Sequence, residues 1–255
     1  MDFQKYISKP RLWLRRKAPE PLRRRIALFK RALLDRRGAA GLIVTPQSPR
    51  ADASYLPQII AQQPIRQSEH TSGKIENLRL AAARLSRVSV APGQIFSFWS
   101  LVGPPTRAGG FQVGRSIVQD RLVAEVGGGL CQISGLAYEL ALRAGMTILE
   151  RFPHSRDLYT EETRFTPLGL DATVVHGFKD LRFCNDGKFP VAFEFAVEDA
   201  EIRGALISPA PLAEWRIDIT RSENEGNRRR AAVSRTDPDG GVHAVSTSLY
   251  VVDTA

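Results

Sequence analysis

The stretch GGGLCQISGLAYELALRAG, residues 127–145, decides the fold and carries the most informative chemistry of the chain. Apolar residues recur after the three glycines at helical spacing, and Gly145 is a residue type that commonly ends a helix. The pattern predicts a helix that begins beside Leu130 and has Cys131 in its first turn.

A thiol at the start of a helix faces unpaired backbone N–H groups and the positive end of the helix dipole, which favour the thiolate. The same N–H groups can receive the oxyanion of a tetrahedral intermediate. Glycines before the helix let a substrate backbone approach closely. Cys131 is therefore a candidate nucleophile, and its alternative role is that of a small core residue, as for most lone cysteines.

A cysteine nucleophile needs a base, and the chain has four histidines, at positions 70, 154, 176 and 243. His154 is the candidate because it follows a predicted strand, 147–152, directly after Pro153. Asp171 and Asp157 are both candidates to orient its imidazole and complete a thiol, imidazole and carboxylate arrangement. The spacing along the chain leaves the choice between these carboxylates open.

The remaining pattern predicts a single α+β domain, in which the Cys-bearing helix packs on a mostly antiparallel sheet and the second half of the chain is rich in strands. Further helices are expected over 20–37 and 74–88, and residues 44–70, rich in Pro, Gln and Ser, predict a connecting loop. Strands are expected over 95–101, 147–152, 171–175, 181–183, 191–196, 215–221, 231–235 and 242–252, with a turn at 237–241 between the last two.

Positive charge is concentrated at one end of the chain. The net charge is +9, but residues 1–40 hold 13 Lys and Arg against three Asp and Glu, so the other residues are close to neutral. We therefore divide the chain into a basic amphipathic arm (1–45), a linker (46–70) and a main domain (71–255) that ends in a β-hairpin extension.

The expected helix 20–37 has an apolar stripe among its basic residues. Leu22, Ile26, Phe29 and Leu33 recur at helical spacing. Such a stripe can dock on the main domain, lie on an anionic membrane surface, or accompany binding to nucleic acid. Docking on the domain is the simplest interpretation, and nucleic acid is the least favoured partner.

Composition excludes several classes of protein. With 255 residues, 43% of them hydrophobic and 25% charged, the chain is not expected to be disordered, collagen-like or a disulfide scaffold. It has no apolar run long enough for a spanning helix and no signal-peptide pattern, which predicts a location in the cytoplasm or at the inner membrane face. Cys184 is expected to be a packing residue, and neither a zinc-binding nor a nucleotide-phosphate motif is present, so no metal or cofactor is expected.

Residues 71–197 resemble the VanW family, named for a protein of vancomycin-resistance clusters of the B type. The matching blocks, in chain order, are PGQIFSF at 92–98, VG at 102–103, GGGLCQIS at 127–134, ER at 150–151 with HS at 154–155, G at 169 with DATV at 171–174, and DLRF at 180–183 with N at 185. Many members of this family are exported or anchored to membranes, unlike the expectation for this chain.

The resemblance implies L,D-transpeptidation, the cross-linking of peptidoglycan stem peptides through an acyl-enzyme. Cys131 would be the nucleophile, His154 the base and Asp171 the residue that orients it. The partner would be a stem peptide or its precursor, and the same site would act as a carboxypeptidase if water accepted the acyl group. Seven residues would shape the substrate site: Gly127, Gly128, Gly129, Gln132, Ser134, Arg151 and Ser155. The alternative is a non-catalytic binding or accessory protein of cell-wall metabolism or glycopeptide resistance.

Overall fold

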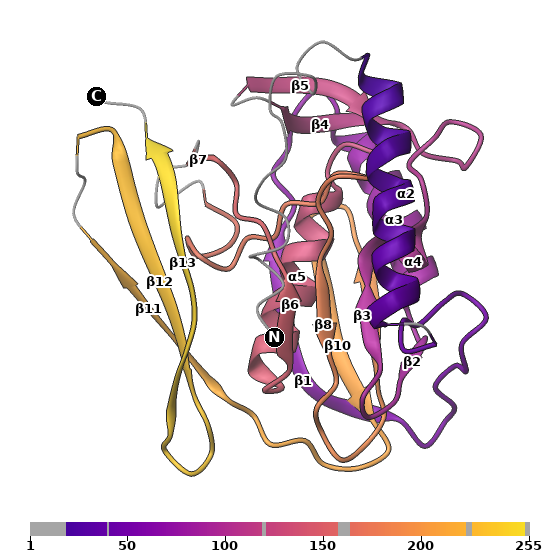
Figure 1. Ribbon diagram of the computed structural model, residues 1–255. Helices are drawn as coiled ribbons and strands as arrows, with labels where there is room; N and C mark the ends of the chain where they lie inside the picture. Colours follow the sequence, from indigo (N-terminus) through magenta and orange to yellow (C-terminus); the bar gives the residue numbers. More distant parts are fainter. Residues whose placement is uncertain (1–18, 40, 119–120, 158–163, 223–225, 253–255) are drawn as a thin grey trace.

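The helix that carries Cys131 packs on a four-stranded antiparallel sheet. The computed structural model of the protein describes residues 19–39, 41–118, 121–157, 164–222 and 226–252. The sheet joins, in order, β1 (Leu56–Pro64), β10 (Glu201–Ser208), β9 (Val191–Val197) and β2 (Ser89–Val90). Helix α5 (Leu130–Arg143) contacts β1 and β10, while α3 (Thr71–Leu85) contacts β9 and α5, so both helices cover one face of this sheet (Figure 1).

Helix α5 is apolar on most of its sides, as is typical of a helix surrounded by protein. Ile133, Leu136 and Leu140 are fully buried in the main core. The helix ends at Arg143, after which Gly145 takes a left-handed conformation and the Met146 N–H donates to the Ala141 carbonyl over 3.0 Å. The predicted helix around Cys131 is confirmed, as is the α+β class with its mostly antiparallel sheets.

A second sheet contains three short strands, in the order β3 (Ile95–Ser97), β8 (Arg182–Cys184) and β6 (Thr147–Glu150). The buried rings of Phe96 and Phe183 stack with their centroids 4.4 Å apart, which joins β3 to β8 in the core. Helix α4 (Phe98–Val102) follows β3 directly.

The three strands predicted near the end of the chain form a separate antiparallel sheet: β11 (Arg216–Arg221), β12 (Arg228–Thr236) and β13 (Val242–Val252). The end of β13 pairs in parallel with the two-residue strand β7 (Arg156–Asp157). This pairing connects the C-terminal sheet to the segment that follows His154 (Figure 1). Tyr250, the residue before this pairing, donates its hydroxyl to Asp171.

Several predicted elements are wrong in place or type. Residues 56–64 form β1 instead of part of the linker 46–70, because their alternating buried side chains face α5 while their backbone pairs with β10. The strand predicted over 95–101 ends at Ser97, whose hydroxyl caps α4 by accepting from the Ser100 N–H. Residues 171–175 form no strand: the carbonyls of Asp171 and Ala172 accept from the side chains of Arg151 and Ser134, and Val175 forms an isolated bridge with Lys179. Strand β10 and the hairpin of β4 (Val113–Val118) and β5 (Arg121–Val126) were not predicted.

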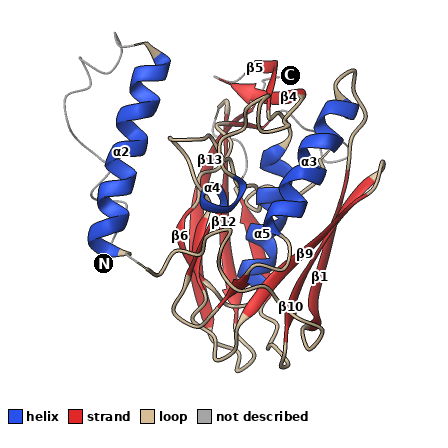
Figure 2. Cartoon of the chain, turned by 90° about the vertical axis from the view of Figure 1, so that its right-hand side faces the viewer, coloured by secondary structure: helices blue, strands red, loops and turns tan. Residues whose placement is uncertain are grey.

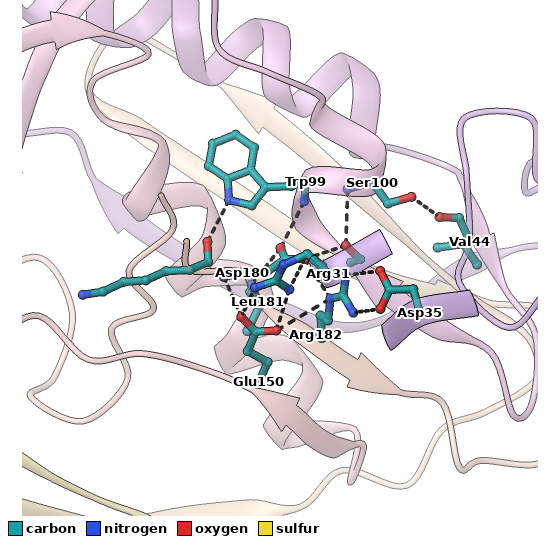
Figure 3. A network of polar contacts seen from close by, with 11 residues as sticks. Arg31, Asp35, Val44, Trp99, Ser100, Glu150, Asp180, Leu181 and Arg182 are labelled. Atoms are coloured by element: carbon teal, nitrogen blue, oxygen red, sulfur yellow. Dashed lines mark hydrogen bonds and ion pairs between the residues drawn. The ribbon is translucent and has the colours of Figure 1, made fainter. Parts of the chain in front are cut away.

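Helix α2 (Glu20–Gly38) confirms the helix predicted over 20–37 and lies at the edge of the molecule (Figure 2). Its apolar stripe does not dock on the domain: Leu22, Ile26, Phe29 and Leu33 are 38% to 71% exposed. The opposite, polar face makes the contact, through ion pairs of Arg31 and Asp35 (Figure 3). In the described part of the chain, no helix has both the length and the apolar character required to cross a bilayer.

The start of α5 is held by a close backbone contact. Gly128 lies against Gly114 of β4, so that a Cβ on Gly128 would be 2.1 Å from the Gly114 carbonyl carbon and 2.2 Å from its oxygen. The buried Asn77 side chain of α3 donates to the carbonyls of Gly128 (2.9 Å) and Gln112 (3.0 Å) and accepts from the Gln112 N–H (2.7 Å). Only a glycine fits at 128.

We expect Gly128→Ala to lower the free energy of unfolding by about 1–3 kcal/mol, because a backbone atom cannot move aside as a flexible side chain can. Gly135→Ala is the matched control in the same helix, since its Cβ would meet atoms at ordinary distances of 3.5–3.8 Å and alanine is the better helix former. Urea unfolding of both variants measures the difference. Equal stability of the two variants would contradict the described approach of β4 to α5.

Candidate active site

Cys131 is the second residue of α5, immediately after the turn that begins the helix. The turn ends at Gly129, which precedes the helix with a left-handed φ of 99°. The half-buried thiol lies 3.8 Å from the Val174 carbonyl oxygen. The first N–H groups of an α-helix have no acceptor within the helix, and the positive end of the helix dipole lies at this end of α5.

The structure places His154 between Cys131 and Asp171. The His154 Nδ1 lies 2.8 Å from the Asp171 Oδ2, and the backbone N–H of His154 donates to the same oxygen over 2.6 Å. The Cys131 thiol is close enough to the imidazole to raise its pKa. Three residues from separate segments thus form a thiol, imidazole and carboxylate series, with the imidazole held by its ring and by its main chain.

Electrostatic effects within this series favour a protonated imidazole. Burial lowers the pKa of His154, but hydrogen bonds to Asp171 and Cys131, together with the charges of these partners, outweigh burial and raise the pKa to about 10. Burial likewise raises the pKa of Asp171, yet the hydrogen bond from His154 and the charge of Arg151 hold it well below its usual range.

The buried Asp171 carboxylate has partners on both of its oxygens. Its Oδ1 accepts from the Tyr250 hydroxyl (2.6 Å) and from Arg151 Nη2 (2.9 Å). Arg151 also donates to the main-chain carbonyls of Asp171 (2.7 Å) and Gly169 (3.0 Å) and to the Ser248 hydroxyl (2.5 Å). Arg151 therefore holds the Asp171 carboxylate through Oδ1, while Oδ2 of the same carboxylate holds the His154 ring.

The second carboxylate candidate lies in a different interaction. Asp157, in β7, forms a two-pronged ion pair with Arg164, with both distances 2.8 Å. The structure therefore brings Asp171, and not Asp157, into contact with the His154 ring. The other histidines lie elsewhere: His70 pairs with Glu69, His176 packs on Trp99 and His243 pairs with Asp237.

Most of the other predicted site residues support the backbone around Cys131. The Ser134 hydroxyl donates to the Ala172 carbonyl (2.5 Å), which ties α5 to the segment after Asp171. Gln132 Nε2 donates to the Pro64 carbonyl at the end of β1 (2.9 Å). Gly127 and Gly129 have positive φ angles, and the space beside Gly128 is filled by Gly114. Ser155 is exposed, and its carbonyl accepts from the Val251 N–H.

A pocket adjoins the imidazole and the carboxylate. Its lining comprises His154, Arg156, Asp157, Arg164, Phe165, Thr166, Pro167, Leu168, Asp171 and Tyr250. The lining therefore combines apolar side chains with charged groups, and it includes the candidate base. Among the described residues, no three metal-ligating side chains come together.

Three residues of the site were not identified from the sequence. Tyr250 and Asn77 reach it from β13 and α3, and no local pattern marks them. Lys74 of α3 lies beside Gly129, and its ammonium is 5.9 Å from the centre of the Phe165 ring, which lines the pocket. Burial and the charge of Arg115 lower the pKa of Lys74 to about 8.

We expect the His154 ring to remain protonated at neutral pH and to titrate near pH 10, whereas a free histidine titrates near 6.5. Because the folded state binds this proton more tightly than the unfolded state, protonation of His154 contributes to the free energy of unfolding. The contribution is complete below about pH 6.5 and is lost as the pH rises towards 10. Imidazole chemical shifts measured by NMR across this range give the pKa directly. Asp171→Asn should lower the value, and titration of the parent chain near 6.5 would contradict the described pairing.

The chain was compared with known proteins. The family model described as VanW like protein matches residues 73–207. The chain is 30% identical over 139 residues to the vancomycin B-type resistance protein VanW of Enterococcus faecalis, which covers 54% of this chain and 50% of that protein. It is 33% identical over 147 residues to the uncharacterized protein YoaR of Bacillus subtilis, which covers 56% of this chain and 47% of that protein.

The chain thus spans about half the length of these relatives. No solved structure gives a significant match. The family model covers more than half of the chain and includes Cys131, His154 and Asp171. By this match, the chain belongs to the VanW family.

Proposed function

We propose that the chain transfers acyl groups of peptidoglycan stem peptides through a thioester on Cys131, as an L,D-transpeptidase or carboxypeptidase. The observation that supports this proposal most strongly is the series formed by Cys131, His154 and Asp171. Membership of the VanW family supports the substrate class, and one relative is named for resistance to vancomycin.

In the first step, the Cys131 thiolate attacks the carbonyl carbon of an L-centre in the donor stem peptide. Backbone N–H groups at the start of α5 stabilise the oxyanion that forms. The His154 imidazolium gives its proton to the leaving nitrogen as the C–N bond breaks, and D-Ala departs. The acyl group remains on sulfur as a thioester, and the imidazole is neutral.

In the second step, a side-chain amine of another stem peptide attacks the thioester, and the neutral imidazole of His154 accepts the amine proton. The C–S bond breaks, which releases the cross-linked peptide and restores the thiolate and imidazolium. Asp171 keeps Nδ1 of the ring occupied, so that Nε2 is the nitrogen that exchanges protons. Water in place of the amine gives hydrolysis.

Lys74 is the group that we assign to the carboxylate of the donor peptide. It borders Gly129, two residues before the nucleophile, and points its ammonium towards the pocket residue Phe165. Burial and the charge of Arg115 lower the pKa of this ammonium to about 8. A bound carboxylate would stabilise the charged form of a half-buried lysine.

A binding or accessory role is the second candidate function. Gly128 serves the contact between β4 and the start of α5, and the Ser134 and Gln132 side chains bind backbone carbonyls of this chain. These residues of the motif thus stabilise the fold, and a protein without catalytic activity would also use them. Turnover and Cys131 dependence distinguish the two functions.

We expect a tetrapeptide stem that ends in D-Ala to give a covalent adduct on Cys131, detectable by intact mass, together with release of D-Ala. Cys131→Ala should abolish both, and His154→Gln should slow D-Ala release by at least about a hundredfold, the usual range for a general acid–base. Cys184→Ser, which changes the other thiol, is the control and should keep full activity. Peptide binding without an adduct or D-Ala release would favour the accessory role.

We expect Lys74→Met to raise the KM for a donor peptide with a free C-terminal carboxylate by about tenfold or more, because hydrogen bonds to charged groups contribute about 1.5–3 kcal/mol. The kcat should change little. The same peptide with an amidated C-terminus should bind parent and variant equally, and Lys74→Arg should restore part of the affinity. A Lys74→Met variant that weakens both peptides equally would contradict the assignment.

A further inference from the structure

Helix α2 exposes its apolar side chains and uses its polar ones to contact the domain. The outer stripe, Leu22, Ile26, Phe29 and Leu33, follows one side of the helix, and its members are 50%, 45%, 71% and 38% exposed. A surface helix normally buries such a stripe against its own domain. The exposed stripe therefore requires another partner.

The opposite side of α2 is held by ion pairs. Arg31 binds the Glu150 carboxylate with two hydrogen bonds of 2.7 Å, and Arg182 binds both oxygens of Asp35 at 2.6 and 3.0 Å (Figure 3). Glu150 and Arg182 lie on neighbouring strands, β6 and β8. These contacts fix the rotation of α2 about its axis and direct the outer stripe away from the domain.

The same side of α2 also packs on a loop. Gly177 lies so close to the helix that a Cβ there would be 2.9 Å from Arg24 Cγ and 3.3 Å from Leu28 Cγ. Leu28 and the neighbouring Ala27 are partly covered, in contrast to the outer stripe. The helix thus has a distinct inner and outer side, and the apolar stripe is on the outer side.

Basic residues border the outer stripe on both sides. At 100° per residue, Arg25 and Arg36 lie along one border and Arg23 and Lys30 along the other, and all four side chains are exposed. We propose that α2 binds the surface of an anionic lipid bilayer, with the outer stripe in the lipid interface and these basic residues among the headgroups. Amphipathic helices with this arrangement bind in the plane of a membrane.

Charge and polarity favour lipid over other occupants of this surface. Nucleic acid would pair with the basic residues but leave the stripe exposed to water. A second copy of the chain would cover the stripe but bring the same basic residues together, and like charges repel. An anionic bilayer has negative headgroups above an apolar interior, which matches both parts of the surface.

The attachment would also orient the candidate active site. The segment from Asp171 to Asp180 runs from the carboxylate that binds His154 to the carboxylate beside Arg31 and Arg182. Gly177, under α2, lies within this segment. A bilayer-bound α2 therefore holds the site at a defined position relative to the lipid surface, whatever reaction the site performs.

The test is flotation of the full chain with phosphatidylcholine vesicles, with and without about 30 mol% phosphatidylglycerol, at about 0.1 M salt. We expect binding only to the anionic vesicles, and weaker binding as salt rises, because salt screens exposed charges. Ile26→Ser with Phe29→Ser should weaken binding at least about tenfold. The matched control is Ile60→Ser with Val242→Ser, two similarly exposed apolar residues outside α2, which should bind like the parent.

A folding control accompanies the flotation test. Circular dichroism should show the same thermal unfolding for the stripe variant and the parent, because the substituted side chains are exposed. The proposal is overturned if the stripe variant binds anionic vesicles as tightly as the parent chain. It is also overturned if the parent binds duplex DNA but not vesicles, or if the stripe instead mediates a dimer that the variant loses.

Discussion

The buried carboxylate of Asp171 is the interaction on which the site depends. A buried charge is costly unless it is paired and fully hydrogen-bonded. Asp171 meets this condition with partners from two segments: Arg151 and His154, which follow β6, and Tyr250 in β13. Satisfying this charge therefore determines where the C-terminal sheet and the His154 segment lie relative to α5.

A second buried carboxylate, Asp180, has a similar role at the other end of the same segment. It accepts from the Ser97 hydroxyl (2.6 Å), the Trp99 N–H (3.1 Å) and Arg182 Nε (2.9 Å), and Arg31 lies 3.6 Å away. Asp171 thus organises the candidate site, and Asp180 organises the base of α2 (Figure 3). Between these two buried carboxylates, the segment turns back on itself through a bridge of Val175 with Lys179.

The start of α5 shows why a motif can be misinterpreted. Three glycines before a cysteine suggest room for a substrate, but Gly128 makes room for the Gly114 backbone. Gly128 contributes to the candidate site indirectly. Its contact with Gly114 and the Asn77 hydrogen bonds hold the start of α5, which carries the thiol, in place. A preorganised first turn keeps its N–H groups and the sulfur in a constant relative position.

The sequence by itself determined the helix around Cys131, the helix of the arm, the C-terminal strands and the candidate pair of Cys131 and His154. These features depend on local periodicity and on residue types with characteristic chemistry. It did not reveal β1, whose Pro and Gln residues conceal a strand that exists through pairing with β10, nor the roles of Lys74, Asn77 and Tyr250.

Only the tertiary structure decided between Asp171 and Asp157, because the choice depends on where Arg151 and Arg164 lie in space. Only the tertiary structure turned the apolar stripe of α2 outward, because the ion pairs of Arg31 and Asp35 join residues more than 100 positions apart. Local pattern shows which face of a helix is apolar. The charges on the partner surface decide which face is buried.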